Sequence, residues 1–148
     1  MATVKQLMNS KTDGINYAVE CDDNVFKALE IMAEANISAV MVEEDNKIVG
    51  IFTERDYSRK CELKGLSAKE TSVRSMMTEK MITVTPETTV DQCMGLMKQY
   101  HIRHLPVVEN DKMVGMISMR DVVDVVISEH ESTIKGLENY ILGSGFST

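Results

Sequence analysis

Residues 50–56 have the sequence GIFTERD, and residues 115–121 have the similar sequence GMISMRD. The similarity extends well beyond these stretches, because residues 19–57 align with residues 84–122 without a gap. Eleven of the 39 aligned pairs are identical, whereas unrelated sequences of ordinary composition match at about one position in fifteen. The sequence therefore predicts an internal duplication.

The two copies share one order of predicted elements. Val25 and Val90 each open a run whose apolar residues follow the i, i+3, i+4, i+7 spacing of one helix face. Two short apolar runs joined by a polar turn then predict a β-hairpin, and a second helix follows directly. Short edge strands are predicted at residues 17–19 and 81–84. Each copy thus has the order β-α-β-β-α.

Neither copy, of about 60 residues, would bury its apolar faces well alone. We therefore predict an α/β (α+β) fold in which the two copies pack about a pseudo-twofold axis. The spacing of Ile134, Leu137 and Ile141 predicts a further helix over residues 128–142, which packs on this module or on a second subunit. The predicted division is a first repeat at 1–63, a linker at 64–71, a second repeat at 72–127, and a C-terminal helix and tail at 128–148.

The composition argues against two classes of partner. Sixteen basic and 23 acidic residues give a net charge of −7, and non-specific binding to nucleic acid or an anionic membrane needs a basic surface. The beginning of the chain lacks the apolar core of a signal peptide, and no stretch is apolar enough to span a membrane. Three widely spaced cysteines are typical of a reducing compartment. These features favour a cytoplasmic location.

The repeated seven-residue stretch admits two interpretations. Thr53 with Asp56, and Ser118 with Asp121, have the spacing of a capping box at a helix N-terminus. The same geometry suits a nucleotide: free N–H groups and the helix dipole attract a phosphate, and the carboxylate accepts from ribose hydroxyls. The glycine at the start of each stretch would let a flat base approach the backbone. The residues alone leave both interpretations open.

These stretches, the sequence IRHLPVV at residues 102–108 and the repeated β-α-β-β-α order resemble cystathionine-β-synthase (CBS) domains. The resemblance covers residues 3–127 and predicts a tandem CBS pair, or Bateman module, of the small stand-alone kind. It implies that adenine nucleotides bind in clefts between the repeats and that pairs dimerise into a disc. AMP is the first expected ligand, and ADP, ATP, NADH and S-adenosylmethionine are alternatives.

The resemblance also implies roles for individual residues. The motif aspartate holds the ribose, the motif Thr or Ser holds a phosphate or ribose oxygen, the first strand contacts the base, and basic residues meet phosphates. The arginine before each motif aspartate is either an exposed ion-pair partner or a phosphate ligand. The predicted nucleotide-binding residues are Tyr17, Val19, Thr53, Arg55, Asp56, Thr83, Val84, Pro86, Arg103, His104, Pro106, Ser118, Arg120 and Asp121.

The copies differ where phosphates are expected to bind. The first copy has Ser38 and Ala39 at the positions where the second has Arg103 and His104. We therefore expect asymmetric anion binding, with one tighter site or one phosphate cluster shared across the pseudo-twofold axis.

The predicted function is regulatory binding of an adenine nucleotide by a homodimer that acts in trans on an unknown protein. The alternative is a ligand-free structural or dimerisation module that mediates protein–protein contact. We expect no enzymatic activity, because the sequence offers no base-oriented nucleophile and no paired catalytic carboxylates. No metal site is expected, because the helix should end between His101 and His104. Cys93 is expected in the core.

Overall fold

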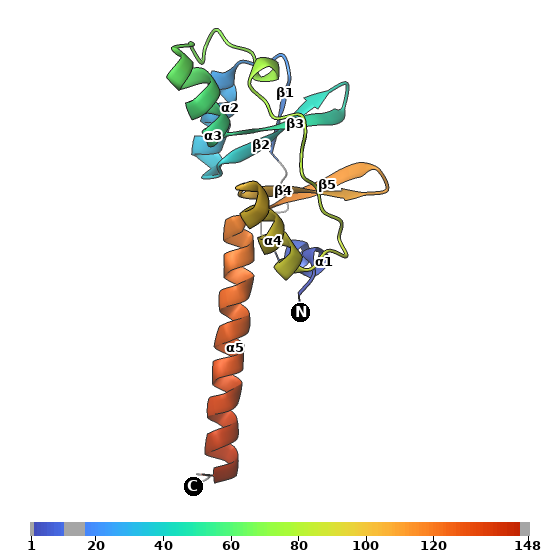
Figure 1. Ribbon diagram of the computed structural model, residues 1–148, viewed down its shortest axis with the longest axis vertical. Coiled ribbons are helices and arrows are strands. Elements are labelled where there is room, and N and C mark those ends of the chain that lie inside the picture. Colours follow the sequence, from blue (N-terminus) through green and yellow to red (C-terminus); the bar gives the residue numbers. More distant parts are fainter. Residues whose placement is uncertain (1, 11–16, 146–148) are drawn as a thin grey trace.

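The computed structural model describes residues 2–10 and 17–145. It consists of two stacked α/β units and a long helix that leads away from the second unit (Figure 1). In the first unit, β1 is parallel to β2, and β2 is antiparallel to β3. The strands form one sheet in the order β1 (Ala18–Glu20), β2 (Ala39–Glu44) and β3 (Lys47–Thr53).

Helices complete the first unit. The helix α2 (Val25–Ala35) joins β1 to β2 and buries Val25, Ala28 and Met32 in the first core. After β3 the chain forms the short helix α3 (Glu54–Asp56) and continues in helical turns as far as Lys64. The apolar spacing that predicted α2 is therefore the spacing that packs it onto the sheet.

The second unit repeats this order with one difference. Its elements are α4 (Val90–Tyr100), β4 (His104–Glu109), β5 (Lys112–Ser118) and α5 (Met119–Gly145). The edge strand predicted at 81–84 is wrong in extent, because only Val84 forms an isolated parallel bridge, to Val107. In the first unit, the Met41 N–H donates to the Tyr17 carbonyl. Pro106 stands at the equivalent position and has no N–H to donate, so that rung of the ladder is missing.

Both hairpins turn through two residues in the left-handed region. The φ values lie between 52° and 62° at Asp45, Asn46, Asn110 and Asp111. Such two-residue turns match the twist of the flanking strands, and Asn and Asp tolerate the left-handed conformation best among residues with a side chain. The predicted hairpins and the predicted mixed α/β fold are thus confirmed.

The two units exchange their leading segments. The helix α1 (Val4–Ser10), from the start of the first copy, buries Val4 and Leu7 in the second core. Conversely, the turn Val73–Ser75 precedes the second copy and places Val73 in the first core. Each core is therefore built from both copies. The division of the chain into repeats at 1–63 and 72–127, with a linker at 64–71, stays a prediction.

The last helix differs most from expectation. The sequence predicts a separate helix over residues 128–142, but α5 is continuous over 27 residues. Ile127 and Ser128 are adjacent inside it, and neither residue breaks a helix. The part of α5 from residue 127 to residue 142 is exposed throughout, so its packing on the module is not observed. No helix among the described residues is long and apolar enough to cross a membrane.

A first prediction concerns Gly50, which lies where the segment before the second copy crosses β3. A Cβ atom on Gly50 would lie 2.9 Å from both Met77 Sδ and the Thr78 carbonyl oxygen. We expect Gly50→Ala to lower the free energy of unfolding by about 1–3 kcal/mol, because a backbone oxygen cannot move aside cheaply. Gly95→Ala is the matched control: Gly95 lies inside α4, and a Cβ atom there would meet nothing within 4 Å. This control is expected to stabilise by about 0.5–1 kcal/mol, and urea unfolding of both variants tests the contrast.

Candidate functional site

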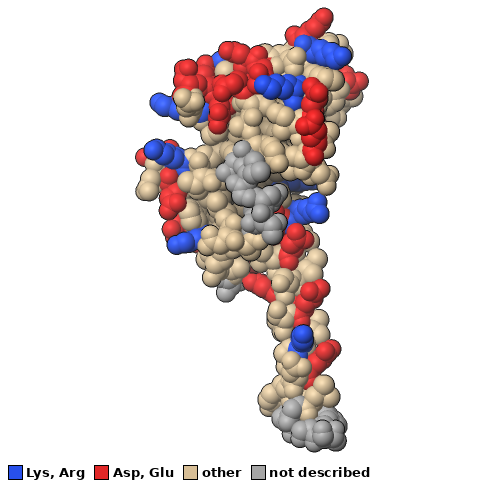
Figure 2. All heavy atoms as spheres, turned by 180° about the vertical axis from the view of Figure 1, so that it is seen from behind, with Lys and Arg blue, Asp and Glu red and all other residues tan. Residues whose placement is uncertain are grey.

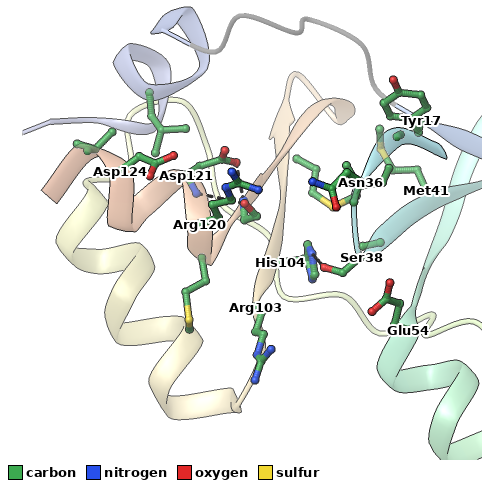
Figure 3. Close-up of a pocket in the computed structure, with 18 of the residues that line it drawn as sticks. Tyr17, Asn36, Ser38, Met41, Glu54, Arg103, His104, Arg120, Asp121 and Asp124 are labelled. Carbon is green, nitrogen blue, oxygen red and sulfur yellow. Dashed lines mark hydrogen bonds between the residues drawn. The ribbon is translucent and has the colours of Figure 1, made fainter. Parts of the chain in front are cut away.

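A cleft of about 930 Å³ lies between the two units and is lined by side chains of both (Figure 3). Its size is near the upper end of the range of about 300–1,000 Å³ that is usual for small-molecule sites. The predicted site residues that it brings together are Tyr17, Arg103, His104, Ser118, Arg120 and Asp121. The first unit adds Ser38 and Glu54, and α5 adds Asp124.

One wall of the cleft is the start of α5. The Ser118 N–H donates to Asp121 Oδ2 over 2.8 Å, and the Asp121 N–H donates to Ser118 Oγ over 3.2 Å. This reciprocal pair is the predicted capping box, and it fixes the Asp121 carboxylate at the helix N-terminus on the cleft wall. The positive end of the helix dipole favours an anion nearby. Capping and ligand binding therefore use the same two residues without excluding each other.

The opposite wall comes from the first unit and is mainly apolar. It includes Tyr17, Ile37, Ala39 and Met41, from the start of the sheet and the turn after α2. Figure 3 places Tyr17 and Met41 across the cleft from Asp121. The wall from the first unit is therefore largely apolar, apart from Asn36, Ser38 and Glu54, and it faces the charged groups of the second unit.

Polar contacts join the two units at the floor of the cleft. Ser38 Oγ and His104 Nε2 share a hydrogen bond of 3.0 Å. Outside the cleft, the Arg55 guanidinium also joins the units, because it donates to the His101 carbonyl oxygen at the end of α4. Arg103 and Arg120 also line the cleft, and Figure 3 shows the Arg120 side chain beside Asp121 and the Arg103 side chain pointing away from them. A ligand at this floor would contact groups that hold the two units together.

The equivalent region of the first motif is filled by the protein itself. Asp56 is buried, and its Oδ1 lies 3.0 Å from Lys60 Nζ. Thr78 Oγ1 donates to the same carboxylate over 3.1 Å, and Asp56 completes the capping box with Thr53. A backbone bridge between Thr78 and Ile51 closes the region over β3. Both carboxylate oxygens of Asp56 therefore already accept hydrogen bonds from residues of this chain.

The second motif lacks one of these groups by sequence. Val125 occupies the position four residues after Asp121, where the first motif has Lys60. Val125 itself lines the cleft. The carboxylate of Asp121 consequently has no lysine one helical turn along α5, and the two motifs are chemically different despite their similar sequences.

The remaining predicted residues lie outside the cleft. Val19, Val84, Pro86 and Pro106 are buried within the units, and Thr83 is exposed. Together with Thr53, Arg55 and Asp56, they remain predictions as ligand contacts. Cys93 is fully buried in the second core, as expected. Among the described residues, no three His, Cys, Asp or Glu side chains are grouped so that they could hold a metal ion.

Asp124, Ser38 and Glu54 are among the cleft residues that were not predicted from the sequence. Asp124 lies three residues after Asp121, and this spacing places both on one face of α5. Ser38 could have been identified from the alignment of the two copies, because it occupies the position in the first copy that Arg103 occupies in the second. Glu54 gave no signal, because its counterpart in the second copy is Met119.

Away from the cleft, an ion cluster fixes the start of the second copy. The Arg74 guanidinium donates to Glu44 Oε1 over 2.6 Å, and this hydrogen bond lowers the pKa of the Glu44 carboxyl. Burial raises the pKa of the Cys21 thiol, and Arg74 partly opposes that shift. The cluster ties the segment before the second copy to β2.

The comparisons with known proteins agree with this architecture. The family model of the CBS domain matches residues 4–62 and again residues 73–128. The mitochondrial CBS domain-containing protein CBSX3 of Arabidopsis thaliana is 42% identical over 149 residues, which cover 95% of this chain and 72% of that protein. That name concerns the relative, and the cytoplasmic location of this chain stays a prediction.

Solved structures show the same fold. A protein with CBS domains from Burkholderia ambifaria MC40-6 is 42% identical and superimposes with a TM-score of 0.83, covering 86% of this chain and 95% of that one. The CBS domain pair of protein MJ0100, solved with 5′-methylthioadenosine and S-adenosyl-L-methionine, is 23% identical with a TM-score of 0.74. It covers 87% of this chain and 98% of its own.

Proposed function

Because the chain belongs to the CBS-domain family and carries the domain twice, we propose that it is a regulatory module that binds an adenine nucleotide between its units. AMP is the first candidate, and ADP, ATP, NADH and S-adenosylmethionine are the alternatives. The module has no catalytic step of its own. It acts on a regulated protein in trans.

One observation carries the proposal: a single cleft contains a partner for each part of a nucleotide. Asp121, at the N-terminus of α5, is suited to accept hydrogen bonds from the ribose hydroxyls. Arg103, Arg120 and Ser118 are suited to the phosphate. The apolar wall with Tyr17 is suited to the base. The acid and the two arginines would be an odd set for an apolar ligand, but they match a sugar phosphate.

The closure of the first motif leads us to infer one nucleotide per chain. A ligand at Asp56 would have to displace both the ion pair with Lys60 and the hydrogen bond from Thr78. It would also have to open the backbone bridge between Thr78 and Ile51. These contacts support the expected asymmetry, to which Lys60 and Thr78 would contribute together with the missing arginine and histidine.

A route from binding to regulation follows from the floor of the cleft. Ser38 and His104 join the units there, and Arg55 reaches the end of α4. A nucleotide that binds one arrangement of the units better than another shifts the population toward it. The regulated partner would read that arrangement at the surface. The MJ0100 pair supports the ligand class, since both ligands in that structure contain adenosine.

The proposal predicts which ligands stabilise the protein. Adenine nucleotides should raise the melting temperature of nucleotide-free protein saturably, because a ligand that binds only the folded state stabilises it by mass action. Ribose 5-phosphate, which lacks the base, should do so much less. Differential scanning fluorimetry with the five candidates and this control measures the effect. If no candidate stabilises the protein, the ligand-free structural module becomes the better account.

A further inference from the structure

The outer part of α5 stands away from both units. The helix extends well beyond the second unit in Figure 1, and its residues from 127 to 142 are all exposed. Most helical stability in proteins comes from tertiary packing of an apolar face rather than from helix propensity. A helical segment that stands alone would therefore be stabilised by a partner that covers its apolar residues.

Most of the exposed apolar residues of α5 fall on one line along the helix, and Met119, Tyr140 and Leu142 lie beside it. Val123, Ile127, Ile134, Leu137 and Ile141 are between 46% and 59% exposed, and with His130 they follow alternating spacings of four and three residues. This is the heptad pattern of a coiled-coil seam. Isoleucine occupies each a position, at 127, 134 and 141, and the d positions hold Val123, His130 and Leu137.

We propose that α5 pairs with α5 of a second copy of this chain to form a parallel, two-stranded coiled coil. Isoleucine at a with leucine at d is the combination typical of two-stranded parallel coiled coils, and the middle of the seam has it at Ile134 and Leu137. The seam from Val123 to Ile141 is about 27 Å long at 1.5 Å per residue. The second copy is the natural partner, because a seam of this kind is complementary to itself.

The charges beside the seam favour the parallel orientation. The e positions are all acidic, at Asp124, Glu131 and Glu138, whereas the g positions are Val126, Thr133 and Tyr140. In a parallel pair, each acidic e residue faces an uncharged g residue of the partner. In an antiparallel pair, e faces e, and acids would meet acids across the seam. Figure 2 shows acidic side chains spaced along this helix, with a basic side chain between them.

The second unit leaves the seam accessible. At the base of α5, Val122 is buried in the second core, and Val125 and Val126 pack against it. At about 100° per residue, the centre of the seam lies roughly a right angle around the helix from these residues. A partner helix can therefore approach without meeting the unit that anchors α5.

His130 is the one polar residue at a seam position. A single polar residue in a coiled-coil seam specifies register and reduces stability. The proposal thus makes two opposite predictions. A charged residue at an a position should weaken the pairing of the helices, whereas leucine at position 130 should strengthen it.

The first test measures the mass of the full chain by light scattering after size exclusion, over a range of protein concentrations. At high concentration, wild type should have twice the mass of the 16.6 kDa chain. Ile134→Asp should dissociate to monomers at a higher protein concentration than wild type, Ser132→Asp on the outer face at the same concentration, and His130→Leu at a lower one. Far-UV circular dichroism of each variant checks that the two units remain folded. A monomeric wild type, or an Ile134→Asp variant that dissociates at the same concentration as wild type, would overturn the proposal.

The second test measures the orientation. Under mild oxidation, Leu137→Cys should form a disulfide-linked dimer, because d residues of parallel helices face each other. Asn139→Cys, two residues away on the outer face, should not. The native cysteines at 21, 61 and 93 are buried, and wild type gives their background. A Leu137→Cys variant that is dimeric by mass but does not cross-link would overturn the parallel arrangement.

Discussion

Replacing Asp121 with alanine is expected to weaken AMP binding about a hundredfold. The carboxylate is placed to accept two hydrogen bonds from ribose hydroxyls, and each bond to a charged group contributes about 1.5 kcal/mol or more. Since about 1.4 kcal/mol corresponds to a tenfold change in affinity, the two bonds together account for the expected loss. Isothermal titration calorimetry of the wild type and Asp121→Ala measures it.

The ligand provides the matched control for this prediction. Binding of 2′-deoxy-AMP to wild type should be weakened, but Asp121→Ala should lose little more when AMP is replaced by 2′-deoxy-AMP. This non-additivity is expected only when the hydroxyl and the carboxylate interact directly. The cap itself accounts for about 1 kcal/mol of stability, so the variant should stay folded. Unchanged affinity in the folded variant would leave Asp121 with the capping role alone.

Replacing Asp56 with alanine is expected to lower the stability of the fold and to leave the affinity for AMP nearly unchanged. It should lower the free energy of unfolding by about 2–3 kcal/mol, because the cap and the hydrogen bonds of a buried charged group are lost together. The Thr53 N–H and Thr78 Oγ1 would both lose the carboxylate that accepts from them. AMP affinity should change little, because Asp56 does not line the cleft. Chemical denaturation and calorimetry on the same preparation separate the two effects.

Asp56→Asn is the control within this motif. The amide can still accept one hydrogen bond at the cap but cannot pair with Lys60, whose Nζ lies 3.0 Å from Asp56 Oδ1. Its stability should lie between wild type and Asp56→Ala. If Asp56→Ala instead abolished AMP binding with little loss of stability, the first motif would be a ligand site, and the inference of one nucleotide per chain would be wrong.

Local patterns predicted the parts of the fold that depend on local interactions. The spacing from Val25 and Val90 placed α2 and α4, and the polar turns at Asp45 and Asn110 placed both hairpins. These features depend on residues within about one helical turn or one strand of each other. Because the sequence is duplicated, the same pattern in both copies supported each predicted helix and hairpin.

Features that depend on distant residues were not predicted. The exchange of α1 and the turn at Val73 between the units joins segments far apart in sequence. The closure over Asp56 requires Thr78, which lies 22 residues away. Both aspartates directly follow an arginine and complete a cap with Thr or Ser, so the motif does not separate the two regions, whereas the contacts of Lys60 and Thr78 do. The continuous α5 was missed because the family pattern ends near residue 127, although no helix breaker lies there.

The stoichiometry of AMP binding tests the central claim most directly. Calorimetric titration of nucleotide-free protein should give one AMP per chain for wild type, one for Asp56→Ala, and no measurable binding at the same concentrations for Asp121→Ala. Because the ratio is counted per chain, dimer formation through α5 does not alter it. Two AMP molecules per chain, or one that remains in Asp121→Ala and disappears in Asp56→Ala, would contradict the account.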